Sequence, residues 1–128
     1  MTKLQAVSTD KAPKAIGPYS QALIAGHEVW TSGQIGLDPV TGELVAGGTE
    51  AETRRVLANL DAVLSAAGVT RADVIRCTVY VVDLKDFGLV NGLYGEFFGE
   101  HRPARSTVQV AALPKGARVE IDAVARHS

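Results

Sequence analysis

The chain has 128 residues, enough for one domain with one continuous hydrophobic core. Apolar residues make up 46% of it, charged residues make up 21%, and the mean hydropathy is +0.10, so the composition is that of a globular protein and not of a disordered one. Thirteen basic and fourteen acidic residues give a formal net charge of −1. Without an excess of positive charge, nucleic-acid binding has no broad electrostatic basis, and we do not expect a nucleic-acid partner.

Six segments alternate apolar with polar residues or are rich in β-branched residues, and turn-forming residues bound them. We predict strands at residues 4–7, 20–25, 28–34, 74–82, 105–111 and 118–126. Gly26-His27 is a two-residue link between the second and third strands, which is typical of a tight hairpin. Pro13 and Gly17-Pro18 indicate a surface loop after the first strand.

Two amphipathic segments predict helices. Thr49 followed by Glu52 has the spacing of a capping box, and an apolar stripe follows it, so we expect a helix from about Thr49 to Ala67. Gly68 suits the C-terminal cap of this helix. The second helix is expected over 84–98, where each of several glycines costs up to about 1 kcal/mol, so this helix needs tertiary packing to persist.

The predicted order βββαβαββ indicates an α+β fold, with both helices on one face of a six-stranded sheet. Alternation would place polar residues of the last two strands together on the other face. These residues are Arg105, Thr107, Gln109, Arg118, Glu120 and Asp122. Such an open polar face is acceptable in water, and it can equally line an oligomer interface.

The only cysteine, Cys77, excludes an internal disulfide framework and a cysteine-rich zinc site. Cys77 lies among apolar residues, which favours a buried, unreactive thiol over a nucleophile. The N-terminus lacks the apolar core of a signal peptide, and no apolar run approaches the roughly 20 residues that span a bilayer. We therefore expect a cytoplasmic protein that makes no membrane contact.

Four stretches carry a recognisable pattern: IGPYSQA at 16–22, TSGQIGLDPVTGEL at 31–44, DLKDFGLVNGLYGEFFGEH at 83–101 and PARSTVQVAALPKGARVEIDAVA at 103–125. Together they resemble the RidA/YjgF family of reactive-intermediate deaminases over nearly the whole chain. The resemblance implies a single chorismate-mutase-like domain over 1–128, in a homotrimer with active sites between subunits. It also implies hydrolysis of small 2-imino or enamino acids to 2-oxo acids and ammonia, a detoxifying activity without cofactor or metal.

The resemblance also implies roles for individual residues. Arg105 matches an arginine that binds the substrate carboxylate, which suits the two parallel hydrogen bonds of a guanidinium. Glu120 matches a glutamate that positions or activates the attacking water, and burial makes a carboxylate a more competent base. Tyr19 matches a tyrosine that helps to close the cleft. The other matches are substrate-binding residues at the cleft: Ser32, Gly33 and Asn91.

One residue departs from the family pattern. Many members carry a cysteine where this chain has Thr107, on the same strand face as Arg105. Threonine keeps a hydrogen-bonding hydroxyl but is a far weaker nucleophile than a thiolate. Because water can attack an imine directly, we predict that Thr107 contacts ligand or water and that activity survives.

The distance between Arg105 and Glu120 depends on how the last two strands are arranged. In a simple hairpin, Arg105 would lie opposite Val124, roughly 13 Å along the strand from Glu120, and a small imino acid could not bridge that gap. The resemblance implies instead that the last strand is inserted elsewhere in the sheet and that a neighbouring subunit completes the cleft. Either arrangement makes the site depend on assembly.

Two other functions could use the same surface. A trimeric module that binds a small carboxylate without turnover would need Arg105, but Glu120 would be dispensable. RNA cleavage finds little support in a chain with a net charge of −1 and no histidine pair. Imine hydrolysis is therefore the leading hypothesis.

Overall fold

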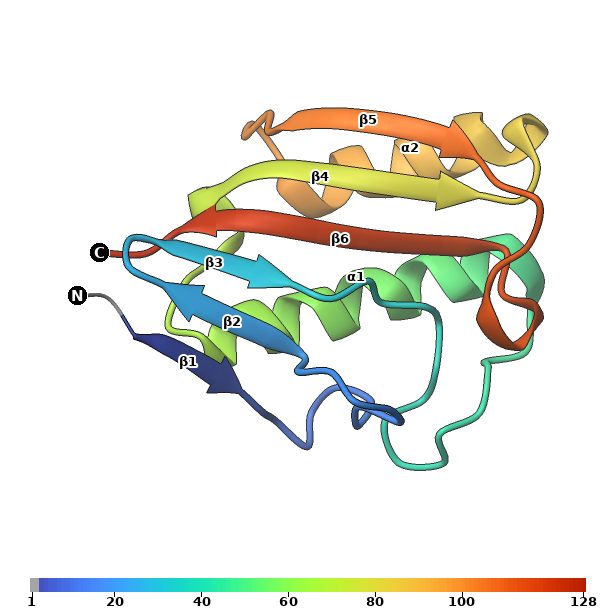
Figure 1. Cartoon of the computed structure of the whole chain (residues 1–128). Coiled ribbons are helices and arrows are strands. Elements are labelled where there is room, and N and C mark those ends of the chain that lie inside the picture. Colours follow the sequence, from blue (N-terminus) through green and yellow to red (C-terminus); the bar gives the residue numbers. More distant parts are fainter. Residues whose placement is uncertain (1–2) are drawn as a thin grey trace.

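Residues 3–128 are described by the computed structural model, in which two helices lie behind a six-stranded mixed sheet (Figure 1). The helices are α1 (Gly48–Ala66) and α2 (Phe87–Phe98). The strands are β1 (Leu4–Val7), β2 (Ala22–Ala25), β3 (Glu28–Thr31), β4 (Val74–Val81), β5 (Ala104–Gln109) and β6 (Val119–Arg126). Short 3₁₀ turns occupy Arg71–Asp73, Leu84–Asp86 and Pro114–Gly116. The predicted number and order of strands and main helices are confirmed.

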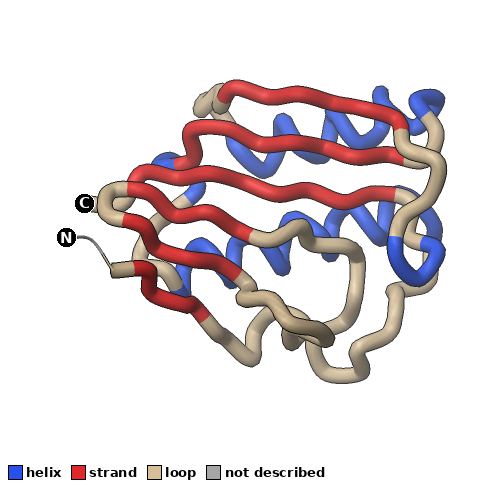
Figure 2. The backbone as a smooth tube through the Cα atoms, viewed as in Figure 1, coloured by secondary structure: helices blue, strands red, loops and turns tan. Residues whose placement is uncertain are grey.

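The last strand is inserted in the middle of the sheet, whose order is β1-β2-β3-β6-β4-β5 (Figure 2). β6 is antiparallel to both β3 and β4, while β5 pairs in parallel with β4 and has α2 as the crossover between them. The simple hairpin between the last two strands is therefore not formed. β2 and β3 do form the expected hairpin around Gly26-His27, with Ala25 opposite Glu28.

The hydrophobic core lies between the sheet and the helices. Alternate residues of β6 are buried there, including Val119 and Ile121, which are both 0% exposed. The apolar stripe predicted for α1 packs against them, and its fully buried members are Val56, Leu60, Val63 and Leu64. Burying each such side chain contributes roughly 1.5–3 kcal/mol, so this layer supports both the sheet and the long helix.

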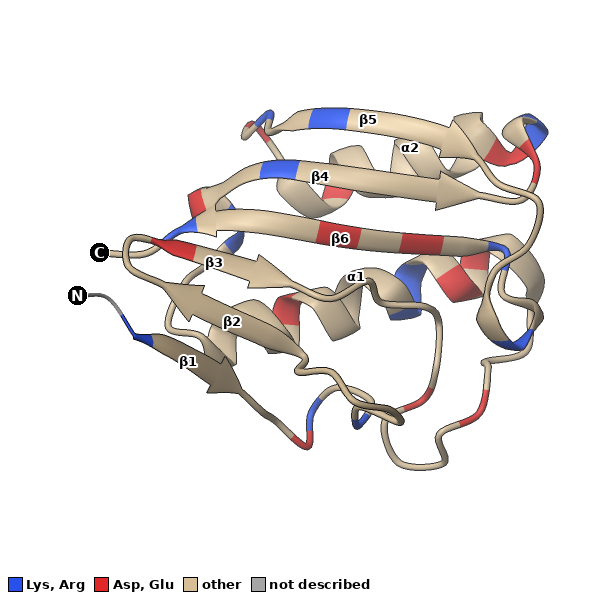
Figure 3. Cartoon of the chain, viewed as in Figure 1, with Lys and Arg blue, Asp and Glu red and all other residues tan. Residues whose placement is uncertain are grey.

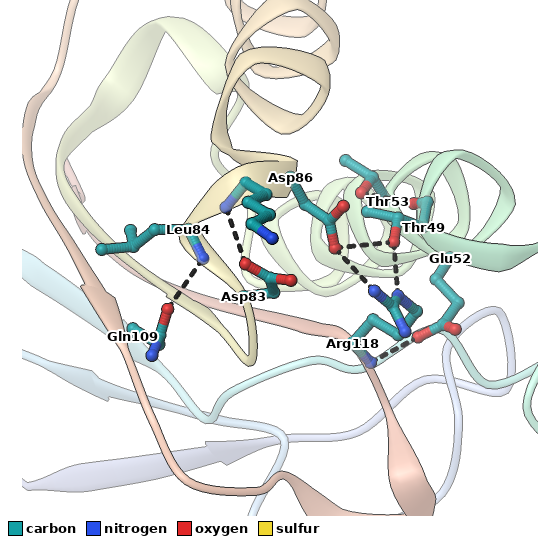
Figure 4. A network of polar contacts seen from close by, with 9 residues as sticks. Thr49, Glu52, Thr53, Asp83, Leu84, Asp86, Gln109 and Arg118 are labelled. Atoms are coloured by element: carbon teal, nitrogen blue, oxygen red, sulfur yellow. Dashed lines mark hydrogen bonds and ion pairs between the residues drawn. The ribbon is translucent and has the colours of Figure 1, made fainter.

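The predicted capping box at the start of α1 is wrong. Gly47, with a left-handed φ of 116°, is the N-cap and the helix begins at Gly48, so Thr49 already lies inside the first turn. The Thr49 Oγ1 atom accepts a 2.6 Å hydrogen bond from Arg118 Nε, and Glu52 Oε1 accepts the Arg118 backbone N–H at 2.8 Å (Figure 4). The two side chains therefore join α1 to the start of β6. The C-terminal prediction is confirmed: Gly68 has a φ of 82° and follows the C-cap in a Schellman pattern of hydrogen bonds.

The predicted face of β5 is also wrong. Arg105 is paired with Cys77 of β4, whose side chain is fully buried under the helices, so Arg105 and Thr107 point to the helix side. Glu120 is paired with Tyr80 on the opposite, uncovered face. β5 is an edge strand, and its apolar residues do not mark the core side of the sheet. Val108, for example, lies on the uncovered face and is 41% exposed. At such an edge, alternation does not report which side holds the core.

Candidate functional site

Glu120 lies in a cavity of about 190 Å³, which we call the Glu120 cleft. Three loop segments form its walls, at residues 13–19, 33–37 and 114–115. Tyr19, which is 50% exposed, belongs to the first wall, and Gly33 belongs to the second. The structure thus brings Glu120, Tyr19 and Gly33 together, although they are far apart in the sequence.

Gly33 packs closely against the Glu120 side chain, and a larger residue there would displace the carboxyl group. A Cβ atom at position 33 would lie 2.7 Å from the Glu120 carboxyl carbon, closer than real Cβ contacts. The segment is held in place because Gln34 and Ile121 exchange backbone hydrogen bonds of 2.9 and 3.1 Å. Ser32 lies beside this segment, but its hydroxyl donates to the Ser20 carbonyl at 2.6 Å, so this group supports the wall of the cleft.

The electrostatic environment of Glu120 suits a general base. Burial raises the pKa of the Glu120 carboxyl, and the neighbouring Asp122 carboxylate raises it further. Asp122 accepts a 3.3 Å hydrogen bond from the hydroxyl of Tyr80, the residue directly opposite Glu120. Figure 3 shows the two acidic positions of β6 in the middle of the sheet. A carboxylate with a raised pKa accepts a proton more readily from water.

Arg105 lies in a second cavity, of about 440 Å³, which we call the Arg105 cleft. Arg105 Nη1 donates a 2.8 Å hydrogen bond to Asn91 Oδ1 of α2. The guanidinium carbon lies 4.8 Å from the Tyr94 ring centroid and 5.5 Å from that of Phe87. These aromatic contacts orient the guanidinium, and Asn91 uses one of its five N–H donors, so others can bind a planar carboxylate.

The two clefts divide the predicted site residues between opposite faces of the sheet. Arg105, Asn91 and Thr107 belong to the helix side, with Arg105 and Asn91 lining the Arg105 cleft. Glu120, Tyr19 and Gly33 belong to the Glu120 cleft, with Ser32 beside it. One chain therefore does not bring Arg105 and Glu120 together into one site.

Several residues at the two clefts were missed in the sequence. Asp122 was predicted on the same strand face as Glu120, but its effect on the pKa of the Glu120 carboxyl was missed, although the spacing of the two residues indicates it. Lys115 was not singled out in the sequence, and it lines the Glu120 cleft with a positive φ of 58°, which is uncommon for a residue other than glycine. The contact of Phe87 with Arg105 depends on the fold of α2 against β5, and no local sequence signal indicated it.

Cys77 takes no part in either cleft, as predicted. Its side chain is 0% exposed, and burial raises the pKa of its thiol to about 11, so the reactive thiolate is rare near neutral pH. Within residues 3–128, no group of three or more His, Cys, Asp or Glu side chains is arranged to hold a metal ion. None of the helices in that same range is long and apolar enough to cross a membrane.

Comparison with known proteins identifies the family. The family model described as endoribonuclease L-PSP matches residues 9–127. Protein DfrA of Myxococcus xanthus is 54% identical, over 94% of each chain, and the human 2-iminobutanoate/2-iminopropanoate deaminase is 50% identical, over 93% of this chain and 87% of its own. The chain therefore belongs to this family, and its resemblance to the RidA/YjgF deaminases is confirmed.

Solved structures agree with this assignment. The structure of Escherichia coli TdcF with bound serine has a TM-score of 0.92 and 45% identity, and the match covers 97% of this chain and 99% of TdcF. RidA from an Antarctic Psychrobacter species has the same TM-score and identity, over 95% of this chain and 98% of its own. The similarity thus extends over nearly the whole fold.

Proposed function

We propose that this protein hydrolyses small 2-imino acids to 2-oxo acids and ammonia. The observation that carries the proposal is the chemistry of the two half-sites: an oriented guanidinium that can bind a carboxylate, and a carboxylate whose pKa is raised by burial. Relatives at about half identity over most of the chain are named 2-iminobutanoate/2-iminopropanoate deaminases. The serine in the TdcF structure is likewise a small molecule with a carboxylate.

We further propose that residues 1–128 act as one chorismate-mutase-like domain in a homotrimer. A cyclic assembly joins two different surfaces of the same chain, so the Arg105 cleft of one subunit can meet the Glu120 cleft of the next. The uncovered sheet face supports this idea, because it exposes Trp30 (53%) and Val108 (41%) beside the acidic pair of β6. A neighbouring subunit that covers this face would remove the apolar surface from water and complete three sites.

In the proposed reaction, Arg105 binds the substrate carboxylate through two N–H groups and so orients the imine. Glu120 takes a proton from water as the water oxygen bonds to the imine carbon, and the C=N electron pair moves to nitrogen. The resulting carbinolamine then breaks its C–N bond. With a protonated imine as substrate, Glu120 first returns its proton to the carbinolamine nitrogen, ammonia leaves with the C–N electron pair, and the hydroxyl proton passes to the Glu120 carboxylate and then to solvent as the C=O bond forms. Tyr19 would limit access of bulk water to this cleft.

A coupled assay tests the activity. A dehydratase acting on threonine would release 2-iminobutanoate, and 2-oxobutanoate formation would be followed with and without this protein. We expect clear acceleration, which Arg105→Ala and Glu120→Gln each abolish. Binding of a small carboxylate that survives in Glu120→Gln, with no acceleration by the wild type, would favour the non-catalytic binding module instead.

Mixed assembly tests the shared site. Arg105→Ala and Glu120→Gln chains would be unfolded together and refolded at a 1:1 ratio. If each site takes Arg105 from one subunit and Glu120 from the next, about a quarter of the sites in random trimers contain both intact residues, and activity returns in proportion. If both residues act from one chain, every site lacks one of them and mixing restores nothing.

RNA cleavage, which the family description names, is less compatible with this chain. Binding of a phosphate backbone depends on clustered cations, whereas the formal net charge is −1 and the Glu120 cleft places two carboxylates near each other. An anionic phosphodiester would be repelled by this pair, while a water molecule would be polarised by it. The small, cationic imine group of the proposed substrate is the better match.

A further inference from the structure

The three walls of the Glu120 cleft are irregular loops, and each is held from the core side by one buried polar side chain. The anchoring residues are Gln21, Glu52 and Asn59, which are 4%, 4% and 0% exposed. A buried polar group costs free energy unless it is hydrogen-bonded, so the partners of these three side chains define what they do. Apart from the Arg55 side chain, which donates to Asn59, those partners are backbone groups of the cleft loops or of their near neighbours.

Asn59 of α1 holds the wall at 33–37. Its Nδ2 atom donates to the carbonyls of Ile35 at 3.2 Å and Leu37 at 3.0 Å, and both residues line the cleft. The Asn59 Oδ1 atom accepts from Arg55 Nε at 2.9 Å, so the whole amide is satisfied. The same loop lies directly on the helix, since a Cβ at Gly36 would be 2.9 Å from the Glu52 Cα atom.

Glu52, two helical turns before Asn59 on the same side of α1, holds the third wall. Its Oε1 atom accepts the Arg118 backbone N–H at 2.8 Å, between the wall at 114–115 and Glu120 (Figure 4). The Arg118 side chain extends this attachment to Asp86 at 3.0 Å. Glu120 is therefore held in position relative to α1 through Arg118, which precedes it by two residues.

Gln21 holds the first wall. Its Nε2 atom donates to the carbonyls of Thr9 at 3.1 Å and Pro13 at 2.7 Å, and its Oε1 atom accepts the Thr9 backbone N–H at 2.7 Å. These contacts close the base of the loop that carries Lys14 and Tyr19 to the cleft. One amide thus takes the place of the regular backbone pairing that this loop lacks.

We propose that Gln21, Glu52 and Asn59 are positioning residues, which set the geometry of the Glu120 cleft without touching the substrate. This proposal rests on the function proposed above. A purely apolar side chain could fill each buried site, as Val56 and Leu60 do on the same helix, but it would leave the loop carbonyls or N–H groups without partners. Arg105 bonds Asn91 and packs against Tyr94, both of α2, and not against these anchors, so the proposed substrate binding and the cleft geometry are separable.

The test uses three variants of the full chain, Asn59→Leu, Glu52→Leu and Gln21→Met, with wild-type assembly checked by size-exclusion chromatography. With 2-iminobutanoate generated by a dehydratase, we expect kcat to fall by about tenfold or more, because small misplacements of reacting groups are costly, while KM changes by less than about threefold. Glu52→Gln keeps an acceptor for the Arg118 N–H and is expected to retain kcat within about threefold.

The matched control is Val63→Ala, a truncation in the hydrophobic core on the same helix, at a side chain with no polar group to bond a cleft loop. Val63→Ala and each anchor variant are compared at urea concentrations chosen so that their free energies of unfolding are equal. Hydrogen–deuterium exchange should rise in each anchor variant only in the loop that its residue holds, whereas Val63→Ala should show no such local increase. Unchanged kcat in the anchor variants, or an equal loss in Val63→Ala, would overturn the proposal.

Failure of the proposed function gives a different result. If the wild type does not accelerate imine hydrolysis, the deaminase assignment is rejected, and the exchange measurement alone decides whether the three side chains hold their loops. Exchange that rises throughout the sheet in the anchor variants would then reject the anchoring as well. An increase in exchange confined to the anchored loop would show that the three side chains hold the cleft walls, whatever reaction the cleft serves.

Discussion

The two clefts are built in different ways. The Arg105 cleft is formed by α2, the segment at 101–103 that follows it and Arg105 of β5, which are neighbours along the chain, and side chains of α2 orient the guanidinium. The Glu120 cleft collects three loops that are distant in sequence, and buried side chains hold their backbones. The half-site that we propose for substrate binding is therefore local in sequence, whereas the half-site that we propose for proton transfer is assembled from distant parts of the chain.

The largest expected effect tests the binding half. Arg105→Lys keeps the charge but loses the planar pair of donors, so kcat/KM should fall by about a hundredfold, the equivalent of losing roughly 3 kcal/mol of charge-assisted hydrogen bonding. The coupled 2-iminobutanoate assay measures this. Arg54→Lys serves as a control, because Arg54 is exposed on α1, where it pairs with Glu50 outside both clefts. Near-normal turnover by an assembled Arg105→Lys protein would remove Arg105 from the site.

The next largest effect tests whether close packing against Gly33 positions the Glu120 carboxyl. In Gly33→Ala the new methyl group would displace the Glu120 carboxyl, so we expect a loss of kcat between about tenfold and a hundredfold. Gly88→Ala is the matched control, since nothing lies within 4 Å of a Cβ at that helical position. It should leave kcat unchanged and stabilise the protein by up to about 1 kcal/mol in urea unfolding. Equal kinetics in the two variants would mean that the carboxylate position does not matter.

The contrast between the clefts also explains what the sequence could predict. The apolar periodicity of α1 reports burial directly, so the helix and its core stripe were predicted correctly. In the edge strand β5 the apolar residues do not mark the buried face, so the predicted face of Arg105 is wrong. Thr49 and Glu52 resemble a capping box in the sequence, but both make tertiary contacts with Arg118. Long-range polar contacts of this kind leave no local pattern, so neither the capping of α1 nor the cleft walls could be derived.

A pH effect follows from the environment of Glu120. Its pKa is raised by burial first and by Asp122 second, so Asp122→Asn should move the acidic limb of the kcat/KM profile to lower pH. Because the folded state raises this pKa, it favours the protonated carboxyl, and the resulting stability is lost as the pH rises through the folded-state pKa. Glu120→Gln should therefore be more stable than the wild type at pH 7, and the difference should shrink below the unfolded pKa.

Urea unfolding of the wild type and Glu120→Gln at neutral and acidic pH measures this difference. Glu43→Gln is the control, because Glu43 is exposed and lies outside β6. A difference that is the same at both pH values would show that Glu120 has no raised pKa in the folded protein. If the acidic limb of the kcat/KM profile does not move in Asp122→Asn, Asp122 does not raise the pKa of Glu120.

The smallest effect asks whether the helix-side half contributes chemistry as well as binding. Thr107 shares the strand face of Arg105, at the position where the sequence resemblance leads us to expect a cysteine in many relatives. If water attacks the imine directly, Thr107→Cys should change kcat/KM by less than about threefold, since no covalent step needs a thiolate. Thr107→Val, which removes the hydroxyl, should cost up to about tenfold, the equivalent of one hydrogen bond. A gain of more than about tenfold in Thr107→Cys, abolished by thiol alkylation, would instead assign nucleophilic attack to this position and give the binding half a chemical role.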